Sequence, residues 1–599
     1  MRVKPTALVG ATGRPPVRAL AVLGAVLAAS GCATPAPDVV SVEVRVPSGV
    51  CRPTGVRAVR LSLLGDFAPS PTDTVELLAS AGARDLAGLR AEMRTLVVEV
   101  EGDGGYLAWG RGSLEAVRAS GVLAALPLYR SCSIADPDAY RPDGAALVTH
   151  PSGSVWIVGG VGAERRIVQV DPRRAFADVL PDALFNPRVG ATATLVGDDV
   201  VVAGGAAGPA ERAFDTYERL GGDARPAGDG PGGRLSVPRR DHGAVRLGEL
   251  LVLVGGRSGG ADDALVDRID LIDLGAGAPR LGPALAVPRT APTALALADG
   301  SIVVLGGRDA SGAPVAVIER IEPGLTRVRT LDVSLPAPEV VLGLGLDRAF
   351  HVADREVRVL SFRSDPPRLE RLTHQSALSS TVGVASANDR VLLVGRNASG
   401  SVSAELWTPH LGTMQTLEAS RVVSALAPLP DGSVLEIGAD GASLRMLEVP
   451  DQWANLPNDR LFFPTDLGDP VVTAGLPGDL DRGVAMRTGA AIGLGALRFG
   501  SLTLSPELDG AASIRLVADG DVTAIEVDAS GNVSGPGCEL PPSGDDPIVI
   551  VRARERLELT RGPLRSRCED VEPSAQLGVE VRLDRGSVLR SLRASRRID

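Results

Sequence analysis

The chain has 599 residues, of which 44% are apolar and 23% are charged. This length exceeds what one hydrophobic core can organise, and the apolar content excludes an intrinsically disordered chain, so we expect two to four domains. The formal net charge of −11 excludes a broadly basic surface, and nucleic acid is not expected as a partner.

Residues 1–31 are typical of an export signal. Basic residues precede an apolar stretch at 19–29, which is too short to cross about 30 Å of hydrocarbon. The small residues before Cys32 resemble the lipobox of bacterial lipoproteins, and this implies that a lipid on Cys32 is the only membrane anchor. The alternative is an ordinary cleaved leader followed by a chance cysteine. Ala33 is not the aspartate that retains lipoproteins at the inner membrane, so an outer-membrane protein is implied, facing the periplasm or the cell surface.

Cleavage after residue 31 changes the balance of charged residues. It removes four basic residues and no acidic ones, so the net charge moves from −11 to −15. It also removes Lys4, the only lysine, and this excludes Schiff-base and Walker-type chemistry in the exported chain.

Residues 32–137 contain three segments in which apolar and polar residues alternate, at 39–46, 56–64 and 95–102. Alternation with a period of two is typical of strands with one buried face. These segments predict a small N-terminal β-sandwich.

An internal repeat dominates residues 138–455. A short apolar strand ends in paired glycines at 154–160, 199–205, 250–256 and 301–307, and the second glycines are 45, 51 and 51 residues apart. Weaker copies near Ala349, Arg390 and Ser433 bring the number of units to seven. Four short strands in about 45 residues are typical of a propeller blade, so the repeat predicts an all-β fold centred on a β-propeller.

Three features of these units resemble the kelch family, which includes galactose oxidase. They are the glycine pairs, the Pro-Arg steps that end at Arg188, Arg239 and Arg289, and Trp407 in the sixth unit. The resemblance implies a kelch-type propeller of seven blades, or six as the alternative, because units five to seven lack the glycine pair. The copper site of galactose oxidase needs a tyrosine cross-linked to a cysteine, and no cysteine lies between Cys132 and Cys538. We therefore expect neither a metal nor another cofactor.

Residues 456–599 contain further strand patterns at 515–528, 548–560 and 578–597. They predict a second β-sandwich, and the strand pattern is similar to that of laminin-G and concanavalin-like domains.

Four cysteines remain once Cys32 is set aside, which suggests two disulfides in an oxidising compartment. Three pairings are possible. Two of the cysteines precede the repeats and two follow them, so the pairs Cys51–Cys132 and Cys538–Cys568 are favoured. Cysteines this scattered do not predict a zinc site.

Arginines open several of the repeated units, and the candidate set is Arg188, Arg240, Arg289 and Arg421. The kelch resemblance implies that this position lies near the mouth of the central channel. A ring of guanidinium groups there would bind a carboxylate or phosphate ligand. The alternative is that each arginine pairs with an acidic residue of the adjacent blade, such as Asp241.

No catalytic set accompanies these arginines, so we expect a protein that is not an enzyme. The predicted function is a binding or scaffold module of the cell envelope, with an envelope protein or a glycan as partner. The alternative is a periplasmic kelch-type enzyme acting on an acidic sugar, similar to a mutarotase or a lyase. The enzyme requires a carboxylate, histidine or tyrosine close to two channel arginines that are open to solvent.

Overall fold

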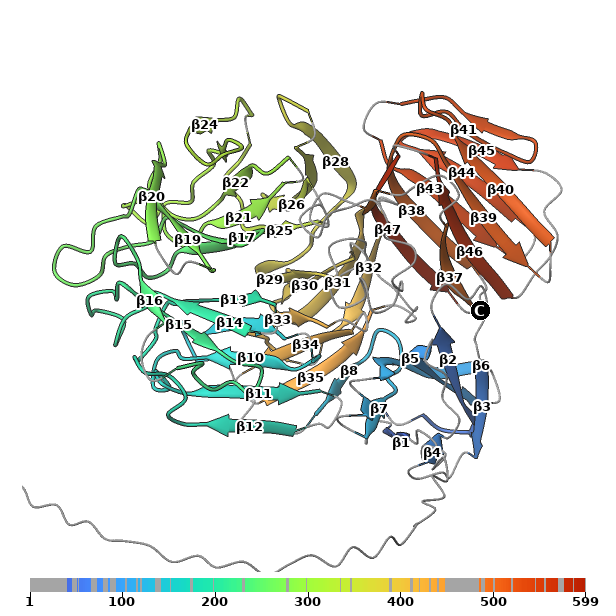
Figure 1. Cartoon of the computed structure of the whole chain (residues 1–599), viewed down its shortest axis with the longest axis horizontal. Helices are drawn as coiled ribbons and strands as arrows, with labels where there is room; N and C mark the ends of the chain where they lie inside the picture. The colour runs from blue at the N-terminus through green and yellow to red at the C-terminus, as the bar shows by residue number, and fades with distance from the viewer. Residues whose placement is uncertain are drawn as a thin grey trace, which may run out of the picture.

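The computed structural model describes residues 40–447 and 484–597 apart from short gaps, of which 66–72, 87–92, 135–141 and 569–575 are the longest. Within these residues the chain is nearly all β (Figure 1). The expected leader and Cys32 lie outside the described residues. No helix in the described ranges is long and apolar enough to span a membrane.

The N-terminal part consists of two sheets that share one hydrophobic core. Alternate residues of the central strands, such as Leu61 and Val98, are buried against Val42 from the other sheet. One sheet has the order β4-β1-β7 and the other β3-β2-β5-β6. The strands are β1 Val40–Arg45, β2 Val56–Gly65, β3 Asp73–Leu78, β4 Arg84–Leu86, β5 Met93–Gly102, β6 Gly105–Ser113 and β7 Val122–Ala124.

The repeats form seven antiparallel sheets of four strands among the described residues, numbered here first to seventh in chain order. The first three sheets contain β9 Ala146–Thr149, β10 Val155–Val158, β11 Ile167–Asp171 and β12 Phe176–Leu180; β13 Thr192–Val196, β14 Asp199–Ala203, β15 Thr216–Leu220 and β16 Gly233–Arg234; and β17 Gly243–Leu247, β18 Leu250–Val254, β19 Arg268–Asp273 and β20 Pro279–Ala284. The next three contain β21 Thr293–Ala296, β22 Ile302–Leu305, β23 Glu319–Ile321 and β24 Val328–Thr330; β25 Val340–Gly343, β26 Arg348–Ala353, β27 Glu356–Ser361 and β28 Arg368–Gln375; and β29 Ser379–Ala385, β30 Val391–Arg396, β31 Val402–Thr408 and β32 Thr413–Glu418. The seventh contains β33 Ala425–Pro428, β34 Ser433–Gly438, β35 Gly441–Met446 and β8 Ser131–Ser133.

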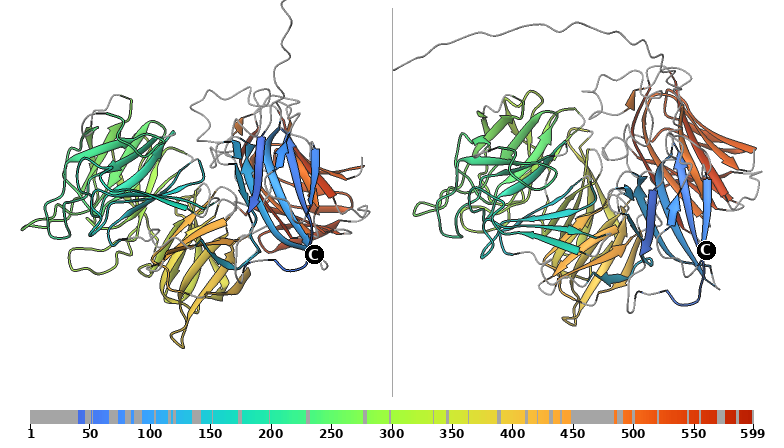
Figure 2. Two further views of the ribbon diagram at one scale, coloured as in Figure 1. Left: turned by 90° about the horizontal axis from the view of Figure 1, so that it is seen from below. Right: turned by 60° about the horizontal axis from the view of Figure 1, so that its bottom comes forward.

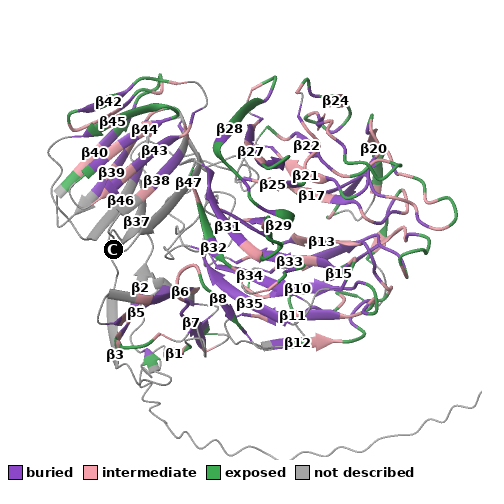
Figure 3. Ribbon diagram, turned by 180° about the vertical axis from the view of Figure 1, so that it is seen from behind, coloured by how far each residue is buried: buried purple, intermediate pink, exposed green. Residues whose placement is uncertain are grey.

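The first strands of these sheets lie side by side around the assembly. β9 contacts β13, the contacts continue through β17, β21, β25 and β29 to β33, and β33 contacts β9. Figures 1 and 2 show the sheets fanning around this line of inner strands. Each second strand is covered on both faces by neighbouring sheets, so β10, β22 and most of β14 and β18 are buried (Figure 3). The arrangement is propeller-like.

The paired glycines lie where the backbones of neighbouring sheets come too close together to leave room for a side chain. Gly255 has a φ of +67°, and a Cβ on it would lie 2.4 Å from the carbonyl oxygen of Arg289 in the next unit. At Gly204 the corresponding distance, to the carbonyl oxygen of Arg239, is 2.3 Å. Glycine meets both requirements, because it adopts positive φ readily and has no Cβ.

We expect Gly255→Ala to lower the free energy of unfolding by more than the roughly 1–2 kcal/mol that a left-handed backbone costs a non-glycine residue, because the new methyl group also meets the Arg289 carbonyl. Gly248→Ala is the matched control, since its φ is +59° and a Cβ there meets nothing within 4 Å. Chemical denaturation of both variants measures the difference. Equal losses would show that the contact with Arg289 is unimportant.

The seventh sheet takes its fourth strand from a distant part of the chain. β8 precedes β9 and pairs with β35 through Leu444 opposite Cys132. The predicted boundary between residues 137 and 138 therefore has to move, because residues 131–133 belong to the repeats in space and not to the N-terminal sheets. The sequence pattern missed this strand because three residues are too few to show a period.

The C-terminal part has two six-stranded sheets, of order β36-β47-β38-β43-β44-β45 and β37-β46-β39-β40-β41-β42. Figure 1 shows them facing each other. A disulfide between Cys538 on β42 and Cys568 on β45 joins them at one edge. The strands are β36 Val484–Ala485, β37 Ala491–Arg498, β38 Ser501–Asp509, β39 Ala512–Ala518, β40 Asp521–Val527, β41 Val533–Gly535, β42 Cys538–Leu540, β43 Ile548–Ala553, β44 Arg556–Arg561, β45 Leu564–Cys568, β46 Gln576–Leu583 and β47 Val588–Arg597.

Candidate functional site

Three of the repeated arginines are buried in ion pairs inside their own sheets. Arg188 pairs with Glu218 on β15 at 2.7 Å, and Arg239 pairs with Asp270 on β19 at 2.8 Å. Arg289 pairs in the same way with Glu319 on β23. All three guanidinium groups are fully covered by protein. Burial lowers the pKa of each arginine, and the facing carboxylate opposes that shift by favouring the charged form.

Each pair also satisfies the backbone where the chain enters the sheet. Glu218 accepts hydrogen bonds from the amides of Phe185 and Asn186, while Arg188 donates to the carbonyl of Gly204 at 2.5 Å. The same pattern recurs in the third sheet, where Arg239 donates to the Gly255 carbonyl at 3.0 Å. One ion pair thus joins the entering loop, the glycine end of the second strand and the third strand.

These contacts correct the expected arginine ring. Arg188 and Arg289 are not open to solvent, so their guanidinium groups are not available to a ligand at a channel mouth. Their acidic partners lie on the third strand of the same sheet and not on the adjacent unit. Arg421 sits at the equivalent position of the seventh sheet and donates to the Glu436 carbonyl and to Ser443 Oγ.

Sequence reasoning missed Arg239 as the equivalent of Arg188 and Arg289, and named its neighbour Arg240. The signal was present, because the Pro-Arg step fixes the register and an acidic residue recurs before apolar ones on the third strand. In the sixth sheet the acid persists as Glu405 without an arginine. There Trp407 donates its indole N–H to Glu405 at 3.0 Å.

Arg240 lies in a different environment from Arg239. It forms a backbone bridge with Arg257, and its guanidinium approaches Asp241 at 3.4 Å and Asp263 at 3.6 Å. Arg257 holds Asp263 more closely, at 2.6 Å, and reaches Asp241 at 3.8 Å. The four residues Arg240, Asp241, Arg257 and Asp263 are called the Arg240 cluster below. Its two carboxylates and Arg257 are each about one third exposed.

The backbone places Asp241 where successive inner strands begin. The amide of Gly190 donates to the Gly144 carbonyl, that of Asp241 to the Gly190 carbonyl, and that of Ala291 to the Asp241 carbonyl, at 2.7–2.8 Å. All four residues have positive φ. This chain of hydrogen bonds links the first four sheets at the entry to their inner strands.

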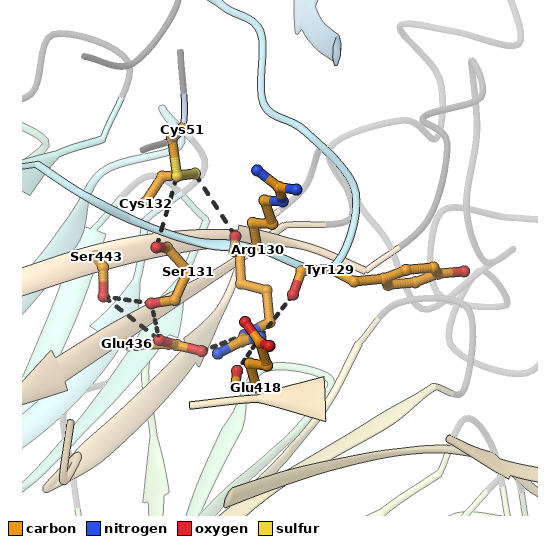
Figure 4. The surroundings of a disulfide bond; sticks show 9 residues. Cys51, Tyr129, Arg130, Ser131, Cys132, Glu418, Glu436 and Ser443 are labelled. Carbon is orange, nitrogen blue, oxygen red and sulfur yellow. Dashed lines mark hydrogen bonds and ion pairs between the residues drawn. A yellow bond between two sulfur atoms is a disulfide. The ribbon is translucent and has the colours of Figure 1, made fainter. Parts of the chain in front are cut away.

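A second polar group surrounds β8, the strand that pairs with β35 (Figure 4). Ser131 Oγ contacts Glu436 at 2.5 Å and Ser443 Oγ at 2.9 Å. Arg445 pairs with Glu436 and donates to the Tyr129 and Glu418 carbonyls. Cys132 on β8 forms a disulfide with Cys51, so this group ties the seventh sheet to the N-terminal part.

No group of three metal-ligating side chains is placed to hold an ion in the part of the chain that the structure describes. Burial, with Arg239 and Arg188 nearby, lowers the pKa of His242 well below its ordinary value, and His242 Nε2 lies 2.9 Å from Thr192 Oγ1. His351 has its pKa lowered to about 4, mainly by burial.

No protein-family model matches the chain, and no curated protein matches it. Among solved structures the chain is similar to the one titled "Structure of YjhT", at 12% sequence identity and a TM-score of 0.35. The match covers 47% of this chain and 98% of that one.

Proposed function

We propose that the seven sheets are the blades of a kelch-type β-propeller and that the parts before and after it are two β-sandwiches. The glycine pairs and the repeated arginine–acid pairs support the kelch type, and the seven four-stranded sheets with their line of neighbouring inner strands support seven blades over six. β8 would then be the strand that closes the ring, since it completes the last blade from a segment that precedes the first.

We further propose that the protein is a non-catalytic binding or scaffold module of the bacterial envelope, exported and tethered to the outer membrane by a lipid on Cys32. The observation that carries this proposal is the burial of the repeated arginines and acids, which makes them parts of a rigid framework. A rigid propeller presents loops of variable sequence to a partner. The two disulfides support an oxidising compartment.

Cross-linking of the tethered protein in intact envelopes, followed by purification, tests the binding role. We expect one envelope protein or glycan to be recovered at high occupancy. The matched control is the same chain with its loops 206–214 and 257–265 replaced by glycine-serine segments of equal length, which should recover less. Turnover of an acidic sugar by the purified protein, without any recovered partner, would favour the enzyme instead.

Labelling with a fatty-acid analogue tests the anchor. We expect the wild-type chain to be labelled and the Cys32→Ser chain to lose the label. The lipid would be attached to Cys32 by a thioether bond, and serine has no sulfur to form it. The matched control is Ser30→Ala, which should keep the label. A Cys32→Ser chain that is still labelled and still sediments with membranes would contradict a lipid at this residue.

A further inference from the structure

The Arg240 cluster contains a nearly buried cation that the surrounding protein satisfies poorly. The side chain of Arg240 is 10% exposed, and among the described residues it has two ion-pair contacts, at 3.4 and 3.6 Å, and no hydrogen bond. Within the described part of the chain, Nε of Arg240 and Nε of Arg257 are both buried without a hydrogen-bond partner. The adjacent Arg239 donates to three carbonyls and a carboxylate. A buried guanidinium without hydrogen bonds is costly, and such a group calls for an explanation.

The two carboxylates of the cluster are held in strained backbone. Asp241 has a φ of +52° and Asp263 a φ of +31°, whereas glycine occupies the position equivalent to Asp241 in the first two units, at Gly144 and Gly190. Aspartate adopts positive φ more readily than most residues, but the conformation is still uncommon. Strain of this kind gathers at ligand sites, where the rest of the structure maintains it.

The cluster is placed where a ligand can reach it. Asp241, Arg257 and Asp263 are each about one third exposed, and the bridge between Arg240 and Arg257 holds the two guanidinium groups on one rigid backbone unit. Arg257 and Asp263 form a close ion pair at 2.6 Å. Asp241 lies farther from the arginines, at 3.4 Å from Arg240 and 3.8 Å from Arg257. Asp241 is therefore the carboxylate whose contacts with the two arginines an incoming anion can take over.

We propose that the Arg240 cluster binds the carboxylate group of a small ligand between Arg240 and Arg257, and that Asp241 takes up a proton when it does so. This inference rests on the proposed binding function and names the chemistry of one ligand site within it.

The balance of charge favours a monoanion. The two arginines contribute two positive charges, and Asp263 cancels one of them. With Asp241 protonated, one positive charge remains, which one carboxylate neutralises. The carboxylate is also planar and matches the guanidinium fork. The protonated Asp241 becomes a hydrogen-bond donor to the ligand.

The groups that face Asp241 support uptake of the proton. Burial raises the pKa of Asp241, Asp263 raises it further, and Arg240 and Arg257 oppose the shift. A ligand carboxylate that engages both arginines weakens this opposition. The neighbouring His242 has its pKa well below the ordinary value, so it is neutral and does not add charge near pH 7.

Ligand-observed NMR titration of the full-length protein with acetate tests the proposal, with acetamide as the uncharged isostere and inorganic phosphate as a second anion. We expect acetate to bind and acetamide not to bind. Arg240→Gln should raise the dissociation constant for acetate at least about tenfold, since it removes one charge from the fork. Arg308→Gln is the matched control, because Arg308 follows the glycine pair of the next unit and its side chain donates, among the residues that the structure describes, only to the Gly312 carbonyl.

The pH dependence separates the role of Asp241 from a general attraction of anions. If one proton is taken up, the dissociation constant of acetate should rise by about tenfold per pH unit above the pKa of Asp241 in the free protein. Asp241→Asn mimics the protonated form and tolerates positive φ, so it should bind acetate tightly and without this dependence.

Three outcomes would overturn the proposal: equal binding of acetate and acetamide, equal effects of Arg240→Gln and Arg308→Gln, or phosphate binding more tightly than acetate. The melting temperature of each variant shows whether it is folded, and Asp241→Asn provides a reading even where Arg240→Gln is unstable. If the wild-type protein did not bind acetate but was still cross-linked to an envelope partner, this site would be rejected and the proposed function would stand.

Discussion

Arg188→Met lowers the free energy of unfolding by about 3–5 kcal/mol, because it leaves the carboxylate of Glu218 buried without its cation. The amides of Phe185 and Asn186 still donate to Glu218, but two hydrogen bonds from neutral groups do not replace a guanidinium. The loss also removes the hydrogen bonds that Arg188 donates to the Gly204 and Thr216 carbonyls. Chemical denaturation followed by tryptophan fluorescence measures the loss.

The control for this prediction is Arg234→Met. Arg234 pairs with Asp215 at 2.9 Å, a distance close to that of the buried pair, but its side chain is 77% exposed. We expect the loss there to be about 0–1 kcal/mol. The double variant Arg188→Met with Glu218→Leu should recover much of the stability that the single variant loses, since no uncompensated charge remains. If the double variant lost as much stability as Arg188→Met alone, Arg188 would act through its packing and not its charge.

Removal of the Cys51–Cys132 disulfide is the second large effect. The cysteines are separated by 81 residues, and closing a loop of this size in the unfolded chain is worth about 4.5 kcal/mol in the chain-entropy model. We expect the double variant Cys51→Ala, Cys132→Ala to lose a large part of this stability. Because Cys132 lies on β8, we also expect faster amide exchange in β34 and β35.

Hydrogen exchange in the double variant Cys538→Ala, Cys568→Ala provides the comparison. This bridge spans 30 residues and lies in the C-terminal sheets. It should change exchange in β42 and β45 and leave β34 and β35 as they are. Unchanged protection of β35 after loss of Cys132 would mean that the polar group around Ser131 and Glu436 holds β8 without the disulfide.

The sequence predicted the repeated sheets because their signal is strong and local. A β-rich strand that ends in two glycines recurs at a spacing close to 50 residues, and the φ values of Gly255 and Gly256 show why the residue type is restricted there. The two disulfides followed from the positions of four cysteines relative to the repeats.

The candidate site was predicted less well, for a geometrical reason. Arg239 and Arg240 are adjacent in sequence, so their side chains leave the backbone in different directions. Arg239 enters the sheet and Arg240 faces Asp241 and Asp263. A one-dimensional pattern cannot tell which of two neighbouring arginines is buried. The partners of Arg240 also come from the 257–265 loop, whose approach depends on tertiary structure.

The pairing of β8 with β35 affects the order in which the protein folds. Ser131 on β8 meets Ser443 on β35 across 312 residues of sequence. A chain that emerges from its N-terminus first presents β8 long before β35, and contacts this distant in sequence form slowly. Cys51 and Cys132 are both available much earlier, so oxidation can fix the position of β8 in advance. The disulfide would then keep β8 in position until β35 is available to pair with it.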